Sequence, residues 1–125
     1  MTLVVNPLVQ RVIGAAIAVH RGLGPGLFES VYERCLAHEL ERQGLSFERQ
    51  VALSLIYEGL AVPCAYRADL IVQRELLVEI KAVDRMLPVH DSQLRTYVRL
   101  SKLRQGLLLN FNVPRLIDGI KSFLA

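Results

Sequence analysis

The sequence predicts an α/β (α+β) fold in which a mixed central β-sheet is flanked by helices on both faces. Two segments with helical spacing of their apolar residues open the chain, and a series of short β-like segments follows them. The 125 residues are 52% hydrophobic and 22% charged, which suits a packed core and excludes a disordered chain. We therefore expect a single domain over residues 1–125.

The first helix is expected to begin after Asn6 and to end near Gly22. Asn6 is a favourable N-cap and Pro7 suits the first helical position. Apolar residues then recur at helical spacing, at Leu8, Val12, Ala16 and Val19. The loop that follows, residues 22–26, is rich in glycine but lacks a preceding strand and a Lys-Ser/Thr ending. It is therefore not expected to bind a nucleotide phosphate.

A second helix is expected from about Leu27 to Gln43, with Gly44 as its stop signal. The next part of the chain is rich in residues typical of strands. Four β-like segments are expected there, at Ser46–Gln50, Leu53–Tyr57, Ala65–Val72 and Leu76–Val83. Glu58-Gly59 is the turn after the second of them.

Pro88 interrupts the chain, and His90–Lys102 is expected to form a third helix. Leu107–Phe111 is mainly apolar and predicts a buried strand. Asn112 and Pro114 are expected to open a last helix that runs to about Phe123. The predicted order is therefore two helices, four strands, a helix, a strand and a helix.

The composition excludes several classes of protein. The longest apolar run, residues 12–19, is far shorter than the ~20 residues of a membrane-spanning helix. No leader-like segment is evident, so we expect a cytoplasmic protein. Cys35 and Cys64 lie among apolar residues and are expected to be buried free thiols. The absence of tryptophan and the few aromatic residues argue against a stacking platform for single strands.

The charge is distributed unevenly along the chain. Residues 1–84 carry 8 basic and 10 acidic residues, whereas residues 85–125 carry 7 basic and 2 acidic residues. A basic C-terminal third is compatible with a polyanionic partner such as nucleic acid. The alternative is that these cations only solvate helix faces.

The most informative segment runs from Arg67 to Lys81. If the hairpin is symmetric about Arg74, Asp69 lies opposite Glu79 and Arg67 lies opposite Lys81. These four side chains then share one face, because side chains alternate along a strand. The other face is entirely apolar and consists of Ala68, Leu70, Val72, Leu76, Val78 and Ile80.

Two carboxylates placed opposite each other repel, but together they suit a hard divalent cation. Mg²⁺ needs only one or two protein carboxylates, with water and phosphate as its other ligands. Such a metal can polarise a phosphodiester and lower the pKa of a bound water, and Lys81 could stabilise the developing charge. The alternative is a solvent-facing hairpin with two ion pairs, Arg67–Asp69 and Glu79–Lys81.

Asp69 followed by Glu79-Ile80-Lys81 resembles the D…E-x-K signature of the PD-(D/E)XK, or restriction-endonuclease-like, superfamily. Ala68 stands where the name of the superfamily has proline. The resemblance implies a restriction-endonuclease-like core.

Two further motifs extend this resemblance. Gly26-Leu-Phe-Glu29-Ser-Val-Tyr32 is similar to the pattern of the small bacterial GxxExxY proteins, which are placed in the same superfamily. Gln93-Leu-Arg-Thr-Tyr97 resembles the Q-x-x-x-Y helix motif of RecB-like and lambda-exonuclease-like nucleases. The resemblance covers roughly residues 7–121.

The resemblance implies a role for each matching residue. Asp69, Glu79 and Glu29 would be ligands of Mg²⁺ or Mn²⁺, together with the backbone carbonyl of Ile80. Lys81 would be the catalytic lysine. Gln93 would steady metal-bound water or phosphate and completes the implied catalytic set of Glu29, Asp69, Glu79, Lys81 and Gln93.

Three further residues are expected to bind substrate. Tyr97 lies one helical turn from Gln93 and would support it or contact the phosphate backbone. Arg67 and Arg95 would provide cationic contacts. Gly26 and Tyr32 are expected to have structural roles.

Several of these residues also have structural explanations. Glu29 near a helix start could complement the helix dipole. Ser30 and Glu33 fit a capping box, which would leave Glu29 outside the helix. Gln93 and Tyr97 could be an ordinary pair on a helix surface.

The function expected from these observations is divalent-metal-dependent hydrolysis of nucleic-acid phosphodiester bonds, with DNA as the expected substrate. One alternative is a non-catalytic nucleic-acid-binding or accessory subunit of the same fold, and another is a protein-interaction module. No membrane partner is expected. A homo-oligomer is plausible because a hydrophobic content of 52% in a small chain leaves apolar surface to cover.

Overall fold

The computed structural model describes residues 5–125. Three α-helices lie in this part of the chain: α1 (Pro7–Leu23), α2 (Glu29–Arg42) and α3 (Pro88–Ser101). The strands are β1 (Phe47–Tyr57), β2 (Leu60–Val72), β3 (Leu76–Lys81), β4 (Gln105–Asn110) and β5 (Ile120–Leu124), and a 3₁₀ helix, η1, spans Leu116–Gly119. No helix in the described part is long and apolar enough to cross a membrane.

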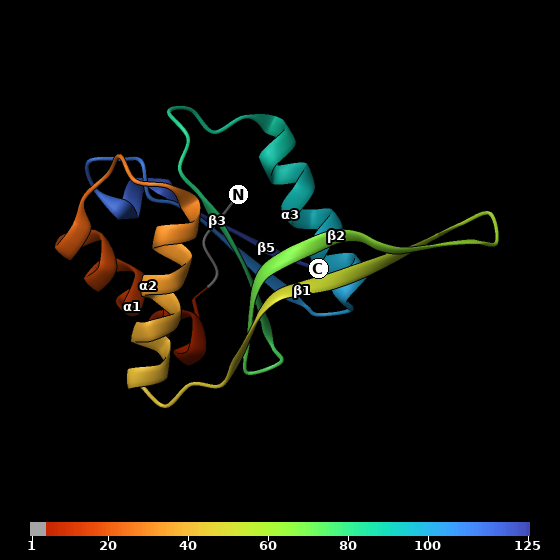
Figure 1. Ribbon diagram of the computed structural model, residues 1–125, viewed down its shortest axis with the longest axis horizontal. Helices are drawn as coiled ribbons and strands as arrows, with labels where there is room; N and C mark the ends of the chain where they lie inside the picture. Colours follow the sequence, from red (N-terminus) through yellow and green to blue (C-terminus); the bar gives the residue numbers. More distant parts are fainter. Residues whose placement is uncertain (1–4) are drawn as a thin grey trace.

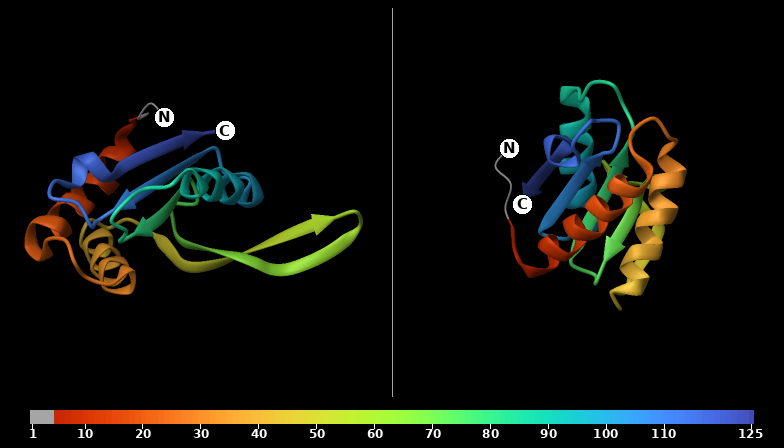
Figure 2. Two further views of the ribbon diagram at one scale, coloured as in Figure 1. Left: turned by 90° about the horizontal axis from the view of Figure 1, so that it is seen from above. Right: turned by 90° about the vertical axis from the view of Figure 1, so that its left-hand side faces the viewer.

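The five strands form one mixed sheet in the order β1-β2-β3-β4-β5. β3 and β4 are parallel, and the other neighbours are antiparallel. α1 and α2 pack on one face of the sheet and α3 packs on the other (Figure 1 and Figure 2). The predicted mixed sheet with helices on both faces is therefore confirmed, and it is consistent with a restriction-endonuclease-like fold.

β3 separates the two hydrophobic cores because its side chains alternate between the faces of the sheet. Leu76, Val78 and Ile80 pack with α1 and α2, whereas Leu77 packs with α3. Glu79 and Lys81 follow Leu77 in the same alternating row. The row that faces α3 thus changes from apolar to charged toward the C-terminal end of β3.

The helix boundaries follow local signals. The side chain of Asn6 caps α1 by accepting a hydrogen bond from the Val9 amide (2.9 Å), as its sequence predicts. α2 begins at Glu29, and its N-cap, Phe28, makes no side-chain cap hydrogen bond. The alternative in which Ser30 and Glu33 form a capping box is therefore wrong, because Glu29 is part of the helix.

The two segments predicted as separate strands at the start of the sheet form one strand, β1. A register shift lies between Leu53 and Leu55, and Gln50 adopts a left-handed backbone conformation with φ 50°. β2 begins at Leu60 rather than Ala65, because it remains paired with β1 up to the Glu58-Gly59 turn. The prediction missed this pairing because the outer residues have no packed face to mark them.

The outer half of the β1–β2 hairpin projects away from the helices, and we call residues 52–66 the arm (Figure 2). Cys64 lies in the arm and is exposed, whereas Cys35 is half-buried. The expectation that Cys64 is buried is therefore wrong. Its apolar sequence neighbours are themselves exposed or half-buried.

The predicted last helix is also wrong. η1 takes only Leu116–Gly119 and is followed by β5, which pairs antiparallel with β4. Gly119 packs directly against the backbone carbonyl of Asn110, and a side chain there would clash. Ile120 then packs with the α1–α2 core and Phe123 with the α3 core, which is the alternation of a strand.

Candidate active site

The predicted register of the β2–β3 hairpin is confirmed. Leu70 pairs with Val78 and Val72 with Leu76, on either side of the turn centred on Arg74. On the side of Leu70 that is away from the turn, the two strands separate: β2 remains paired with β1, and β3 remains paired with β4. Asp69 is the residue of β2 next to the last β2–β3 pair, so it lies where the two strands separate.

Where β2 and β3 separate, carboxylate side chains take the place of backbone carbonyls as hydrogen-bond acceptors between the two strands. The Asp69 amide donates to Glu79 Oε1 (2.9 Å), and the Ile80 amide donates to Asp69 Oδ2 (2.8 Å). Each carboxylate is therefore held by the backbone of the opposite strand. This reciprocal arrangement fixes both carboxylates side by side, as the hairpin register predicts for Asp69 and Glu79.

The faces of β2 differ from the prediction. Ala68 packs with the α3 core, whereas Leu70 packs with the α1–α2 core, so the two residues do not share one apolar face. Asp69 and Gln50 lie between the Arg49–Leu70 and Val51–Ala68 pairs, and Gln50 has a left-handed φ of 50°, which changes the direction of β1. At this point the alternation of side chains is interrupted in both strands, so that residues two apart face opposite sides of the sheet. The Asp69 carboxylate lies at this interruption.

Glu33 joins the site from α2, and sequence reasoning missed it. Its side chain is buried and accepts hydrogen bonds from Arg49 Nε (3.0 Å) and Gln50 Nε2 (2.6 Å). Gln50 Nε2 also lies 3.2 Å from Asp69 Oδ1, so Gln50 connects the carboxylate of Glu33 with that of Asp69. The available signal was its spacing: Glu33 lies four residues after Glu29, on the same helix face.

Glu29 is exposed at the start of α2. No described hydrogen bond joins its side chain to the carboxylate pair. Its negative charge nevertheless raises the pKa of both Asp69 and Glu79. Glu29 is therefore close enough to contribute to the negative field of the site.

Tyr32 and the glycine loop place Glu29. The buried Tyr32 hydroxyl donates to the Gly24 carbonyl (2.6 Å) and accepts from the Leu27 amide (3.1 Å), while its ring stacks on Phe111 with a centroid distance of 4.5 Å. Gly26 has a φ of 97°, which a residue with a side chain rarely adopts. Together these contacts hold the loop that leads into α2.

α3 and the end of β3 bring the other predicted residues together. Lys81 Nζ donates to Gln93 Oε1 (3.1 Å). Tyr97, one turn further along α3, packs against Tyr66 with a centroid distance of 5.2 Å. Burial raises the pKa of Tyr97, and the charges of Glu79 and Asp69 raise it further, so its hydroxyl lies within electrostatic range of the two carboxylates.

The two arginines expected to bind substrate do not join this cluster through any described contact. Arg67 is exposed and donates to the Gln50 carbonyl at 3.4 Å. It does not lie opposite Lys81 in the strand pairing, because Lys81 pairs with Asn110 of β4. Arg95 lies over the ring of Phe123, 5.6 Å from its centroid, on the side of α3 that faces β5.

The pKa values of both carboxyl groups are raised, and that of Glu79 is raised strongly. Burial, followed by the charge of Asp69, raises the pKa of Glu79 from 4.5 to about 8, although the Asp69 amide and Lys81 lower it. Burial also raises the pKa of Asp69, with further increases from Glu33 and Glu29. Without a cation the protein therefore favours protonation of Glu79, and a bound cation would compensate the negative charge of the pair.

The donor set fits a hard divalent cation. Among the described residues, no group of three or more His, Cys, Asp or Glu side chains is arranged to hold a metal ion. Mg²⁺ does not require such a group, since it commonly uses one or two carboxylates and keeps several waters. The Asp69 and Glu79 carboxylates meet that requirement, and the Ile80 carbonyl is the further ligand that the family resemblance implies.

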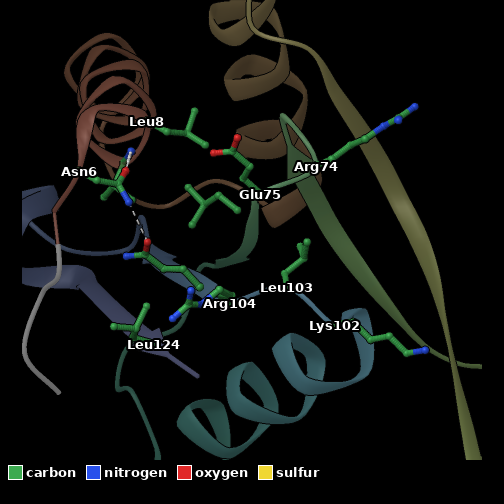
Figure 3. Close-up of a pocket in the computed structure, with 11 residues that line it drawn as sticks. Asn6, Leu8, Arg74, Glu75, Lys102, Leu103, Arg104 and Leu124 are labelled. Atoms are coloured by element: carbon green, nitrogen blue, oxygen red, sulfur yellow. Dashed lines mark hydrogen bonds between the residues drawn. The ribbon is translucent and has the colours of Figure 1, made fainter.

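A separate pocket lies at the opposite end of β3, with a volume of ≈ 500 Å³ (Figure 3). Leu8 and Leu103 line it, and Asn6 Nδ2 donates to Gln105 Oε1 across it at 3.0 Å. The side chains of Arg74 and Lys102 extend away from these residues (Figure 3). This pocket shares no residue with the carboxylate site.

Residues 6–123 match the PD-(D/E)XK nuclease superfamily. The chain belongs to that superfamily. The superfamily is named for its nucleases, which generally use divalent metals. No curated protein matches the chain.

A solved structure shares the fold of this superfamily member. The crystal structure of SSO0001 is similar with a TM-score of 0.54 and 24% sequence identity. The match covers 76% of this chain and 48% of SSO0001, so this chain spans about half the length of that protein. At this identity the likeness concerns the fold alone.

Proposed function

We propose that this PD-(D/E)XK domain is a Mg²⁺- or Mn²⁺-dependent nuclease that hydrolyses phosphodiester bonds, with DNA as its substrate. The observation that carries the proposal is the reciprocal fixation of the Asp69 and Glu79 carboxylates where β2 and β3 separate. A buried carboxylate, Glu79, beside a half-buried one, Asp69, destabilises the protein unless a cation or a proton accompanies the pair. Their arrangement is therefore better explained by metal binding than by stability.

Asp69, Glu79 and the Ile80 carbonyl would hold the metal, and Glu29 would add negative charge from α2. The bound metal would polarise the phosphodiester and lower the pKa of an attacking water. Glu33 would act indirectly, since it orients Gln50, which in turn contacts Asp69.

Lys81 supports the reaction from the α3 side. Its ammonium group has three N–H donors, and one of them is directed to Gln93. The remaining donors can stabilise negative charge that develops on the phosphate oxygens. Gln93 is thus proposed to position Lys81, and Tyr97 to shape the same side of the site.

We also propose that the chain is a GxxExxY-type member of the superfamily. The contacts of Tyr32 with Gly24 and Leu27 give that motif a physical role, because they hold the loop that places Glu29 at the start of α2. The single-domain organisation of residues 1–125, a cytoplasmic location and a homo-oligomeric state stay predictions.

A second candidate is a non-catalytic nucleic-acid-binding or accessory subunit of the same fold. The observation that favours it is the position of Arg95 and Arg99 side by side over Phe123 of β5, 5.6 Å and 5.7 Å from the ring centroid. These cations lie outside the carboxylate site and could bind phosphate without catalysis.

The decisive experiment measures cleavage of labelled single- and double-stranded DNA and RNA by the wild type, with Mg²⁺, with Mn²⁺ and with a chelator. Cleavage that requires metal and is lost in Asp69→Asn and in Lys81→Met supports the nuclease. Glu75→Gln, in the turn of the same hairpin, is a control and should retain most activity. Metal-independent binding that survives Asp69→Asn, without cleavage of any substrate, would instead support the non-catalytic subunit.

A further inference from the structure

The arm, residues 52–66, extends beyond the helices as a two-stranded ribbon (Figure 1). β1 and β2 stay paired out to Tyr57 and Leu60, whereas β3 pairs with β2 only from Leu70 to Val72. No third strand of the described chain supports the arm. Because an isolated two-stranded ribbon is marginally stable in water, the arm needs a further contact to hold its conformation.

The arm also exposes large apolar side chains. Ile56, Tyr57 and Leu60 are 74%, 66% and 62% exposed. Only the base of the arm is covered, where Leu53 packs with the α3 core. Tyr57 pairs with Leu60 on one face of the ribbon, and Ile56 lies on the other face. Large apolar side chains exposed together on a protein mark an interaction site.

The near absence of charge in the arm indicates which kind of partner it can bind. Residues 52–66 contain no lysine or arginine, and Glu58 is their only charged residue. Nucleic-acid binding depends on cationic contacts with phosphates, so the arm does not suit DNA or RNA. An uncharged protein surface with its own apolar side chains is the complementary partner.

β1 is in addition an open edge of the sheet, because the strand order gives it β2 as its single neighbour among the described strands. Its outer segment, Val51–Tyr57, contains no charge and no proline. Natural proteins usually protect such edges, since the free N–H and C=O groups pair readily with another strand. A second β1 strand matches this edge, because a two-fold axis pairs a strand antiparallel with itself.

We propose that the arm is the contact between two copies of this chain, which pair their β1 strands antiparallel across a two-fold axis. The pairing occupies the outward backbone groups of Val51–Tyr57 and covers Ile56 and Tyr57. It joins two five-stranded sheets into one continuous sheet. The interface does not depend on the proposed function, because Asp69 and Glu79 lie outside the arm.

Sedimentation equilibrium from low to high micromolar protein tests this interface. We expect the wild type to shift from monomer to dimer, and Ile56→Lys/Tyr57→Lys to stay monomeric because the substitution places four cations at the contact. Both side chains are exposed, so the variant should keep the wild-type circular dichroism and melting temperature. Phe28→Lys is the matched control, since Phe28, the N-cap of α2, is 81% exposed outside the arm and its substitution should leave the dimer intact.

Hydrogen exchange gives a second readout that needs no variant. Dimerisation should slow exchange of the amides in Val51–Tyr57 at high protein concentration, and dilution should reverse this, while α2 amides stay unchanged. A wild type that is monomeric throughout, or a dimer that persists in Ile56→Lys/Tyr57→Lys, would overturn the proposal. So would a monomer whose binding to DNA is lost in that variant, because the arm would then contact substrate.

Discussion

Asp69 and Glu79 each accept a hydrogen bond from the strand that carries the other. The Asp69 amide donates to Glu79 at 2.9 Å, and the amide of Ile80, next to Glu79, donates to Asp69 at 2.8 Å. Backbone donors stabilise the charged form of each carboxyl, whereas burial and neighbouring carboxylates oppose it. The opposing effects are larger for both groups, and the raised pKa of Glu79 leads to the first two predictions.

The metal-free protein should lose stability as the pH rises from about 5 to 8. The pKa of Glu79 is raised from 4.5 to about 8 in the folded state, so between these values the folded protein retains a proton that the unfolded chain releases. The free energy of unfolding then falls with pH by up to about 1.4 kcal/mol per pH unit. The raised pKa of Asp69 acts in the same direction.

Urea unfolding of the wild type and of Glu79→Gln across this pH range measures the effect. Glu79→Gln should flatten the dependence and be more stable than the wild type at pH 8, because the neutral amide needs no proton. Glu75→Gln, a substitution of an exposed carboxylate in the hairpin turn, should behave as the wild type. A variant Glu79→Gln with the full wild-type pH dependence would show that another group titrates.

Divalent metal should bind with release of a proton and should stabilise the folded protein. At pH 7 the Glu79 carboxyl, with its pKa of about 8, is mostly protonated, so a cation must displace that proton. Calorimetric titration of Mn²⁺ in two buffers with different ionisation enthalpies measures the release. Affinity should increase from pH 6 to 8, and a chelator should reverse the gain in melting temperature.

Asp69→Asn should abolish this binding, whereas Glu75→Gln should retain it, although both remove one carboxylate from the same hairpin. Equal metal affinity of the wild type and Asp69→Asn would place the metal elsewhere. If the wild type did not bind metal at all, the reciprocal hydrogen bonds of Asp69 and Glu79 would have only a structural role.

The carboxylate pair was predictable from the sequence, whereas much of its surroundings was not. Symmetry about Arg74 and alternation along two strands are sufficient to place Asp69 beside Glu79. The contribution of Glu33 depends on Gln50, whose left-handed conformation has no local signal in the sequence. Contacts that depend on how α2 lies against a distorted strand cannot be read from the spacing of residues.

The end of the chain shows a different limit. Leu116, Ile117, Ile120, Phe123 and Leu124 have helical spacing, so periodicity predicts a helix. The structure instead uses Ile120–Leu124 to extend the sheet beside β4. Tertiary pairing with β4 and the close packing of Gly119 on Asn110 outweigh the local preference, and neither is visible before β4 is in place.

Lys81 and Gln93 should act as a coupled pair in cleavage. Lys81→Met should reduce kcat by about 10²-fold or more, because it removes the cation that stabilises charge on the phosphate. Gln93→Ala should reduce kcat about tenfold, since one hydrogen bond to a charged group is lost. The double variant should be no slower than Lys81→Met alone, because Gln93 acts through Lys81.

Single-turnover rates of the four proteins on a substrate that the wild type cleaves complete this cycle. Metal affinity should stay unchanged in all of them, because neither residue is a proposed ligand. Strictly additive losses would show that Gln93 contacts substrate or water independently of Lys81.

Removal of the Tyr32 hydroxyl should weaken both the fold and the site. The hydroxyl is buried and bonds both the Gly24 carbonyl and the Leu27 amide, so Tyr32→Phe should lower the free energy of unfolding by about 1–3 kcal/mol. The loop then loses the contacts that fix the start of α2, and cleavage should fall because Glu29 is no longer held in place. Urea unfolding and cleavage rates at a temperature well below the transition measure the two effects separately. Tyr57→Phe removes the same group from an exposed arm residue and should change stability by less than about 0.5 kcal/mol. If Tyr32→Phe lost stability but kept full cleavage, the hydroxyl would stabilise the loop without positioning Glu29.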